Sequence, residues 1–151
     1  MPNFDISQSM EGAINSLSDV EKKIYNSMLN KMEKGLGTIE LDAKKNCSVD
    51  TGALRASITH TKQLGLHEVT GIIGSPLEYA CFVHEGTGLF AIGGNGRQNV
   101  PWVYRNPLTG QFYSTKGQKP NPFLKTAMEQ NRSKLDSIFS SEDKILWYMR
   151  Y

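Results

Sequence analysis

The chain has few cysteines and no long hydrophobic run, and both features exclude classes of protein. Its 151 residues include only Cys47 and Cys81, which lack Cys-x-x-Cys spacing and are too few for a disulfide framework. We therefore interpret both as small apolar residues in a reducing compartment. No run approaches the ~20 apolar residues that a membrane helix needs, and no signal-peptide pattern follows Met1. We expect synthesis in the cytoplasm and no contact with a membrane.

Complete catalytic, metal and nucleotide motifs are also missing. His84-Glu85 begins like the zinc-protease pattern His-Glu-x-x-His, but Gly88 stands where the second histidine belongs. Residues 86–91 match Gly-x-Gly-x-x-Ala, yet the glycines that follow cannot begin the helix that this nucleotide fingerprint requires. Cys81 and His84 stand three residues apart without a visible orienting group or oxyanion hole, so we expect a buried thiol beside a half-exposed imidazole. The sequence predicts no cofactor, no metal and no enzymatic activity.

Acidic residues are absent from one long stretch. Residues 86–125 contain no Asp or Glu, although the whole chain has a net charge of only +2. The basic residues of this stretch are Arg97, Arg105, Lys116, Lys119 and Lys125. Such clustering favours a face that meets an acidic partner or DNA, and the alternative is a solvated loop with a chance charge bias.

Length and periodicity predict a single α+β domain. A chain of this size buries about 70% of its unfolded surface. We divide residues 1–151 into a helical N-terminal region (1–48), a β-rich region with mobile loops (49–125) and a helical C-terminal region (126–151). The expected fold has two N-terminal helices, a small antiparallel sheet of four or more strands with hairpins, and a C-terminal helix packed on the sheet.

Residues 7–46 carry the helical pattern. Ser18 followed by Glu21 fits a capping box, so we expect a break between two helices near residues 17–19. Gly35 and Gly37 weaken the second helix by about 1 kcal/mol each relative to Ala, which favours a kink or a shift of register there. One apolar stripe, for the core or for an interface, consists of Met10, Ile14, Leu17, Ile24, Met28, Met32 and Leu36.

Strand signals occur in two pairs. Residues 57–63 and 68–74 have strand composition with Gly65 between them, which favours a hairpin. His60 and His67, in or beside it, have no carboxylates at regular spacing, so no metal site is expected. A second, aromatic hairpin joins residues 102–104 to 111–114 across the turn sequence Asn106-Pro107-Leu108-Thr109-Gly110.

Between the two hairpins we expect a short helix and then a mobile loop. The helix starts at Ser75-Pro76 and has an apolar inner face of Tyr79, Phe82 and Val83. Five glycines in residues 86–100 predict a loop that is mobile in the free subunit and becomes ordered on assembly.

The C-terminal helix opens at Pro122, and Ser140-Ser141 interrupts it before a final helical piece at residues 142–151. Its apolar face comprises Phe123, Ala127, Leu135, Ile138 and Phe139.

Three short blocks stand in a fixed order along the chain. The first is Asp50-Thr51-Gly52-Ala53-Leu54-Arg55-Ala56-Ser57-Ile58, the second is Tyr79-Ala80 with Glu85-Gly86-Thr87, and the third is Pro120, Pro122, Phe123 and Leu124. Together they resemble the minor tail component or tail-completion family of long-tailed bacteriophages, proteins of the head–tail connection.

Each block also has a physical interpretation. Asp50 or Thr51 can cap a turn that Gly52 permits, while Leu54 and Ile58 reach the core. Arg55 offers a fork for a carboxylate, with Glu85 as the candidate partner, or is an exposed side chain of little energetic weight.

The resemblance implies a structural phage or prophage protein that completes the tail or joins it to the head connector. The implied partners are the connector, terminator and tail-tube proteins, in the tail or neck of the virion and, during assembly, in the host cytoplasm. A homo-oligomeric ring is a further option that the sequence leaves open. The main alternative is a nucleic-acid-binding module that uses residues 86–125 with Trp102, Tyr104, Phe112 and Tyr113, and non-specific contact with DNA in the channel fits both interpretations. A small hydrolase is a third option without a supporting constellation.

Overall fold

The computed structural model describes residues 18–65 and 68–140 and confirms an α+β fold. The first expected N-terminal helix and the expected helical piece at 142–151 lie outside these residues. The described elements are α2 (Asp19–Asn46), α3 (Ala53–Ser57), β1 (Thr59–Leu64), β2 (Val69–Gly74), α4 (Ala80–Glu85), the 3-10 turn η1 (Gly88–Phe90), β3 (Trp102–Arg105), β4 (Phe112–Thr115) and α5 (Phe123–Ser140).

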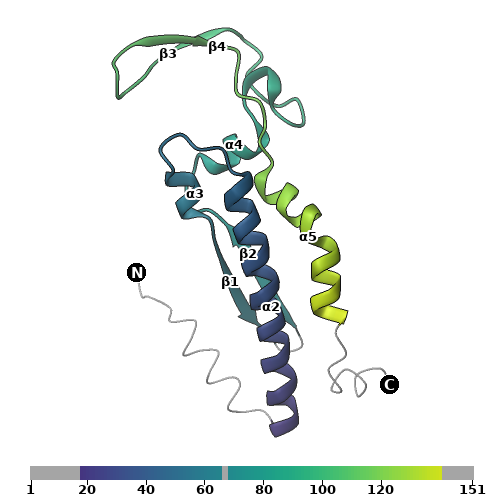
Figure 1. The fold of residues 1–151 in the computed structure, drawn as a ribbon. Helices are drawn as coiled ribbons and strands as arrows, with labels where there is room; N and C mark the ends of the chain where they lie inside the picture. The colour runs from purple at the N-terminus through teal and green to yellow at the C-terminus, as the bar shows by residue number, and fades with distance from the viewer. Residues whose placement is uncertain (1–17, 66–67, 141–151) are drawn as a thin grey trace.

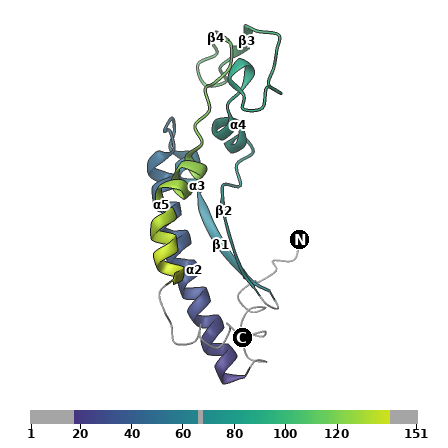
Figure 2. The same cartoon turned by 90° about the vertical axis from the view of Figure 1, so that its right-hand side faces the viewer.

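The molecule is elongated and has three parts (Figures 1 and 2). The body consists of α2, the β1–β2 hairpin and α5. The arm, residues 88–116, carries the β3–β4 hairpin and extends from one end of the body. The neck between them is built from residues 48–58, 79–87 and 117–124, and includes α3 and α4. No helix in the described part of the chain is long and apolar enough to cross a membrane.

The start of α2 follows the sequence prediction. Ser18 Oγ accepts a hydrogen bond from the Glu21 amide, and the Glu21 carboxylate accepts one from the Ser18 amide at 2.9 Å. This capping box satisfies two amide groups that a helix N-terminus otherwise leaves without partners. The helix then runs to Asn46 without a break at Gly35 or Gly37.

The buried face of α2 is wider than the single predicted stripe. Leu36 is buried as expected, whereas Leu29, Ile39 and Ala43 were not part of the predicted stripe and are also buried. The reason is that α2 packs on two neighbours at once: α5 lies along one side and the β1–β2 hairpin along another (Figure 1). A helix held between two elements buries more than one row of side chains.

Gly35 allows α5 to approach α2 closely. A Cβ atom at Gly35 would lie 3.0 Å from Leu135 Cδ2, so the missing side chain makes room for α5. Further along, the buried Asn131 side chain donates to Asp42 Oδ2 at 2.7 Å and to the Ala127 carbonyl at 2.9 Å. The C-terminal helix therefore packs mainly on α2, rather than on the sheet as expected from the sequence.

Both expected hairpins are present, but they do not join. β1 pairs with β2 from Thr59–Gly74 to Leu64–Val69, and β3 pairs with β4 from Trp102–Thr115 to Arg105–Phe112, each antiparallel. The described strands thus form two separate two-stranded sheets instead of one sheet of four. The first sheet lies on α2, where Gly71 leaves space for Met32 and Leu36.

A polar network fastens β1 to α2 at the edge of this contact. His60 Nδ1 is hydrogen-bonded to Glu40, and His60 Nε2 lies 3.2 Å from Glu33. Lys44 pairs with Glu40, and Lys62 Nζ lies 2.9 Å from Glu33. Partial burial lowers the pKa of His60, but the hydrogen bonds with Glu40 and Glu33 raise it by more, so the pKa lies above its ordinary value. Sequence spacing missed both carboxylates because they come from another element.

This network makes stability depend on pH in a defined direction. A histidine whose pKa is raised by folding stabilises the protein fully below its unfolded pKa of about 6.5, and the contribution is lost as pH rises through the higher folded value. The difference in unfolding free energy between wild type and His60→Gln should therefore shrink as the pH rises above about 6.5. Urea denaturation at several pH values measures it. A difference that grows with pH would contradict the assigned protonation.

Candidate functional site at the neck and arm

The three sequence blocks meet at the neck. Leu54 and Ile58 of the first block and Phe123 of the third are buried in one core cluster with Ile39, Ala43, Cys47 and Ala127. Phe123 is 1% exposed, and full burial of such a side chain contributes about 1.5–3 kcal/mol. The second block reaches this cluster through Ala80 and Val83, which pack against it. The blocks therefore first serve to build the junction between body and arm.

The first block forms a tight turn. Gly52 adopts a φ of 86°, which glycine reaches without strain, and Thr51 Oγ1 accepts a hydrogen bond from the Ala53 amide at 3.3 Å. Arg55 Nη2 donates to the Cys47 carbonyl at 2.9 Å. No ion pair links Arg55 to Glu85 within residues 18–65 and 68–140, so that proposed pairing was wrong. The guanidinium instead ties α3 to the end of α2.

The helix of the second block differs from its prediction. α4 begins at Ala80 rather than at Ser75, because Ser75 Oγ accepts from the Leu77 amide and holds a turn there. Tyr79 is 44% and Phe82 59% exposed, so the expected apolar inner face is reduced to the half-buried Val83. A helix of six residues can present only about one turn to the core, which leaves the other apolar side chains outside.

Cys81 and His84 are not arranged as a nucleophile and base. Cys81 is exposed, contrary to the expected buried thiol, and its Sγ donates to the Glu78 carbonyl. The His84 ring packs edge-to-face on Phe123 with centroids 5.4 Å apart. Cys47, interpreted from the sequence as a small apolar residue, is buried, and burial raises the pKa of its thiol, which disfavours the reactive thiolate. The described residues contain no group of three His, Cys, Asp or Glu side chains placed to hold a metal.

The two ends of the arm cross at very short distance. The Thr87 amide donates to the Gln118 carbonyl at 2.9 Å, and the Leu89 amide donates to the Lys116 carbonyl at 3.0 Å. A Cβ atom at Gly88 would lie 2.2 Å from the Lys116 carbonyl oxygen, and one at Gly117 would lie 2.0 Å from the Thr87 carbonyl oxygen. Only glycine fits at either place. Sequence composition indicates Gly88 as a loop former and gives no sign of its role in this crossing.

The arm itself exposes large apolar side chains. Leu108, Phe112 and Val103 are 87%, 73% and 65% exposed. Tyr104 stacks on Tyr113 across the strands with centroids 5.9 Å apart, and Asn106 Oδ1 accepts from the Leu108 and Thr109 amides in the predicted turn. In the described elements β3 and β4 contact chiefly each other, and isolated two-stranded hairpins are marginally stable in water. The arm therefore has the exposed apolar surface that is typical of a protein–protein contact site.

The five predicted basic residues are all exposed, but they do not share one surface. Arg97, Arg105 and Lys116 lie on the arm, Lys119 in the neck and Lys125 in α5. Arg97 stacks over the Trp102 ring at 5.1 Å, and Arg105 Nε donates to the Gly110 carbonyl. Local contacts thus hold two of the three arm cations in fixed positions.

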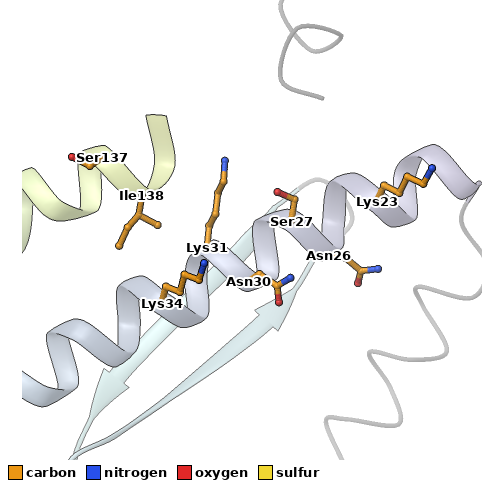
Figure 3. Close-up of a pocket in the computed structure, with 8 residues that line it drawn as sticks. All are labelled: Lys23, Asn26, Ser27, Asn30, Lys31, Lys34, Ser137 and Ile138. Atoms are coloured by element: carbon orange, nitrogen blue, oxygen red, sulfur yellow. The ribbon is translucent and has the colours of Figure 1, made fainter. Parts of the chain in front are cut away.

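A further basic groove lies at the opposite end of the body. It has a volume of about 700 Å³ between α2 and the end of α5, and Lys23, Lys31 and Lys34 line it with Asn26 and Asn30 (Figure 3). Sequence reasoning missed this groove because its lysines are interspersed with acidic residues along α2, and only the helical turn brings them to one side.

Comparison with known protein families assigns the chain to one of them. Residues 9–86 match the family model HK97-gp10-like, described as "Bacteriophage HK97-gp10, putative tail-component". The match spans just over half of the 151 residues and includes the first block and all of the second except Thr87, while the arm and the third block follow it. The protein is thus a bacteriophage tail component, and it belongs to the HK97-gp10-like family. No curated protein and no solved structure matches the chain.

The neck crossing gives a first test of this site. Gly117 has a φ of 121° and no room for a Cβ atom, so Gly117→Ala should lower the free energy of unfolding by about 1–3 kcal/mol. It should also speed amide exchange at Thr87 and Leu89, whose hydrogen bonds cross to the same segment. Chemical denaturation and hydrogen exchange measure the two effects.

Gly37→Ala is the matched control. Gly37 lies in α2, and a Cβ atom there would have no neighbouring atom within 4 Å, so alanine should stabilise the helix by up to about 1 kcal/mol. Equal effects of the two substitutions would show that the crossing imposes no special constraint.

Proposed function

We propose that this phage tail component completes the tail or joins it to the head connector at the head–tail interface. Family membership supplies the tail assignment. The observation that carries the finer proposal is the arm. Its hairpin exposes Val103, Leu108 and Phe112, and three exposed cations also lie on the arm. The close backbone crossing at its base directs it away from the body. Such an element contributes little to the fold of its own subunit and fits a role in assembly.

The proposed partners are the connector, terminator and tail-tube proteins, with further copies of the chain in a ring. A ring multiplies the same few charges around its axis, so a weak patch on one subunit becomes a strong collective one. Acidic partner surfaces are the contacts that we assign to Arg97, Arg105 and Lys119, and passing DNA is a secondary contact for a ring around the channel. We place the protein in the virion neck and, during assembly, in the host cytoplasm. In this proposal it catalyses no reaction, which agrees with a Cys81 thiol bonded to the Glu78 carbonyl and a His84 ring packed on Phe123.

Charge reversal tests the proposed contact. The triple variant Arg97→Glu, Arg105→Glu, Lys119→Glu should remain folded, because exposed charges each contribute less than about 1 kcal/mol to stability. It should nevertheless fail to complement a phage that lacks the gene, with loss of infectious particles. Circular dichroism and melting temperature report the fold, and plaque counts report assembly.

The control variant reverses three exposed cations of the body, Lys23, Arg132 and Lys134. It has the same change of net charge and should support phage yield. Normal yield from the arm and neck variant would overturn the assigned role of these cations and leave the charge bias without a function. Electron microscopy of the defective lysate should show separate heads and tails; normal joined particles that cannot infect would place the defect after joining.

A further inference from the structure

A groove in the neck collects the exposed members of the sequence blocks. It has a volume of about 510 Å³ and lies between the turn after α2 and the start of α4, with Gln118 at its side. Its lining includes Asp50, Thr51 and Tyr79 together with Val49 and Leu54. Val49 is 52% and Tyr79 44% exposed, so the groove has an apolar floor that water reaches. Core packing explains Leu54, Ile58 and Phe123, but it does not explain these exposed residues.

The groove and the arm have opposite charge. Residues 86–125 hold five of the 17 basic and none of the 15 acidic residues, so this stretch carries +5 and the remainder carries −3. Asp50 lies in the groove, and Glu78 and Glu85 flank it along the chain; all three are exposed and form no ion pair within the described residues. Arg55, the cation of the first block, is bonded to the Cys47 carbonyl rather than to one of these carboxylates.

The arm cannot occupy the groove of its own chain. β3 and β4 extend away from α3 and α4 in both views, and the neck crossing at Gly88 and Gly117 holds the base of the arm in that direction (Figures 1 and 2). The neck groove of a second copy, by contrast, is accessible to the arm of the first. The apolar residues at and beside the arm tip, Leu108 and Phe112, match the apolar floor, and Arg105 matches Asp50 in charge.

We propose that the arm of one copy docks in the neck groove of the next copy. The contact is head-to-tail, because the arm and the groove are different surfaces, and repetition of such a contact produces a ring or an open filament. This inference rests on the proposed function only in assigning the ring to the phage neck; the contact itself is tested without phage. Burial of Leu108 and Phe112 supplies the hydrophobic gain that the hairpin lacks alone.

Two complementary variants of the full chain test the docking. The arm variant, Arg105→Glu with Leu108→Asp, has an altered tip and an intact groove. The groove variant, Val49→Lys with Asp50→Arg, has an intact arm, and neither exchanged side chain is buried. The matched control, Val20→Asp with Lys134→Glu, makes the same kind of change as the arm variant on exposed positions of the body.

Sedimentation and light scattering over a range of concentrations give the readout. Wild type and control should associate into rings or longer assemblies, and each test variant alone should associate at least about tenfold more weakly, a loss of 1.4 kcal/mol. An equal mixture of the two variants should associate again, because each mixed pair retains one intact arm and one intact groove, and the reversed charges face each other at the altered contact. Circular dichroism confirms that every variant is folded.

Three results would overturn the docking. They are a wild type that stays monomeric at every concentration, a groove variant that still associates normally, and a mixture that associates no more strongly than either variant alone. The second result would assign the groove to a different partner. Phage complementation is a separate readout: if the variants lose the contact but support normal yield, the docking stands and the proposed function at the head–tail interface fails.

Discussion

The burial of Phe123 is the interaction on which the rest of the structure depends. This side chain stands at the first residue of α5, where the chain returns from the arm, and it packs with Leu54 and Ile58 from the other side of the neck. The His84 ring lies edge-on against it. One residue thus anchors α5 on α2, closes the neck and fixes the point at which the arm leaves the body. Truncating a buried phenylalanine typically costs about 3–5 kcal/mol, a large part of the stability of a small domain.

Two glycines in the crossing at the base of the arm restrict the direction in which the arm leaves the body. A hairpin attached through two flexible strands would point in many directions, and ordering it on a partner would cost about 1–2 kcal/mol for each residue fixed. Here the backbone segments at Gly88 and Gly117 cross so closely that side chains are excluded, and the Thr87 and Leu89 amides are bonded across the crossing. The base of the arm is therefore already ordered before a partner binds. The mobility predicted for residues 86–100 stays a prediction, although Thr87 and Leu89 near the start of this segment are bonded across the crossing.

Local signals in the sequence predicted local structure well. The Ser18–Glu21 capping box and the Asn106–Gly110 turn involve residues a few positions apart, and both hairpins lie within two residues of their predicted positions. The burial of Leu54, Ile58 and Phe123 was also predicted, because their apolar side chains follow clear turn signals. These features depend on interactions that the chain forms with its near neighbours.

The sequence predictions that were wrong share a cause, because each concerned a feature that depends on contacts between distant segments of the chain. The width of the α2 face depends on where α5 and β2 pack, and the two hairpins stay apart because the neck directs the second one outward. Arg55 bonds a carbonyl at the end of α2 rather than Glu85, and His60 finds Glu33 and Glu40 on another element. Within the candidate site, sequence could name the basic residues of the arm but could not show that the fold distributes them over arm, neck and α5.

The residues that carry the family resemblance divide into two sets with different physical roles. Leu54, Gly86 and Phe123 are buried, so the fold of the neck explains them. Asp50, Thr51 and Tyr79 are exposed around a groove, where a fold-stability role explains little. Since the family match ends at Gly86, the groove lies largely within the matched region while the arm lies beyond it. In the proposed docking, the receiving groove therefore lies largely in the part of the chain that matches the family model and the arm lies outside it, so the length and chemistry of the arm can set which neighbour it reaches.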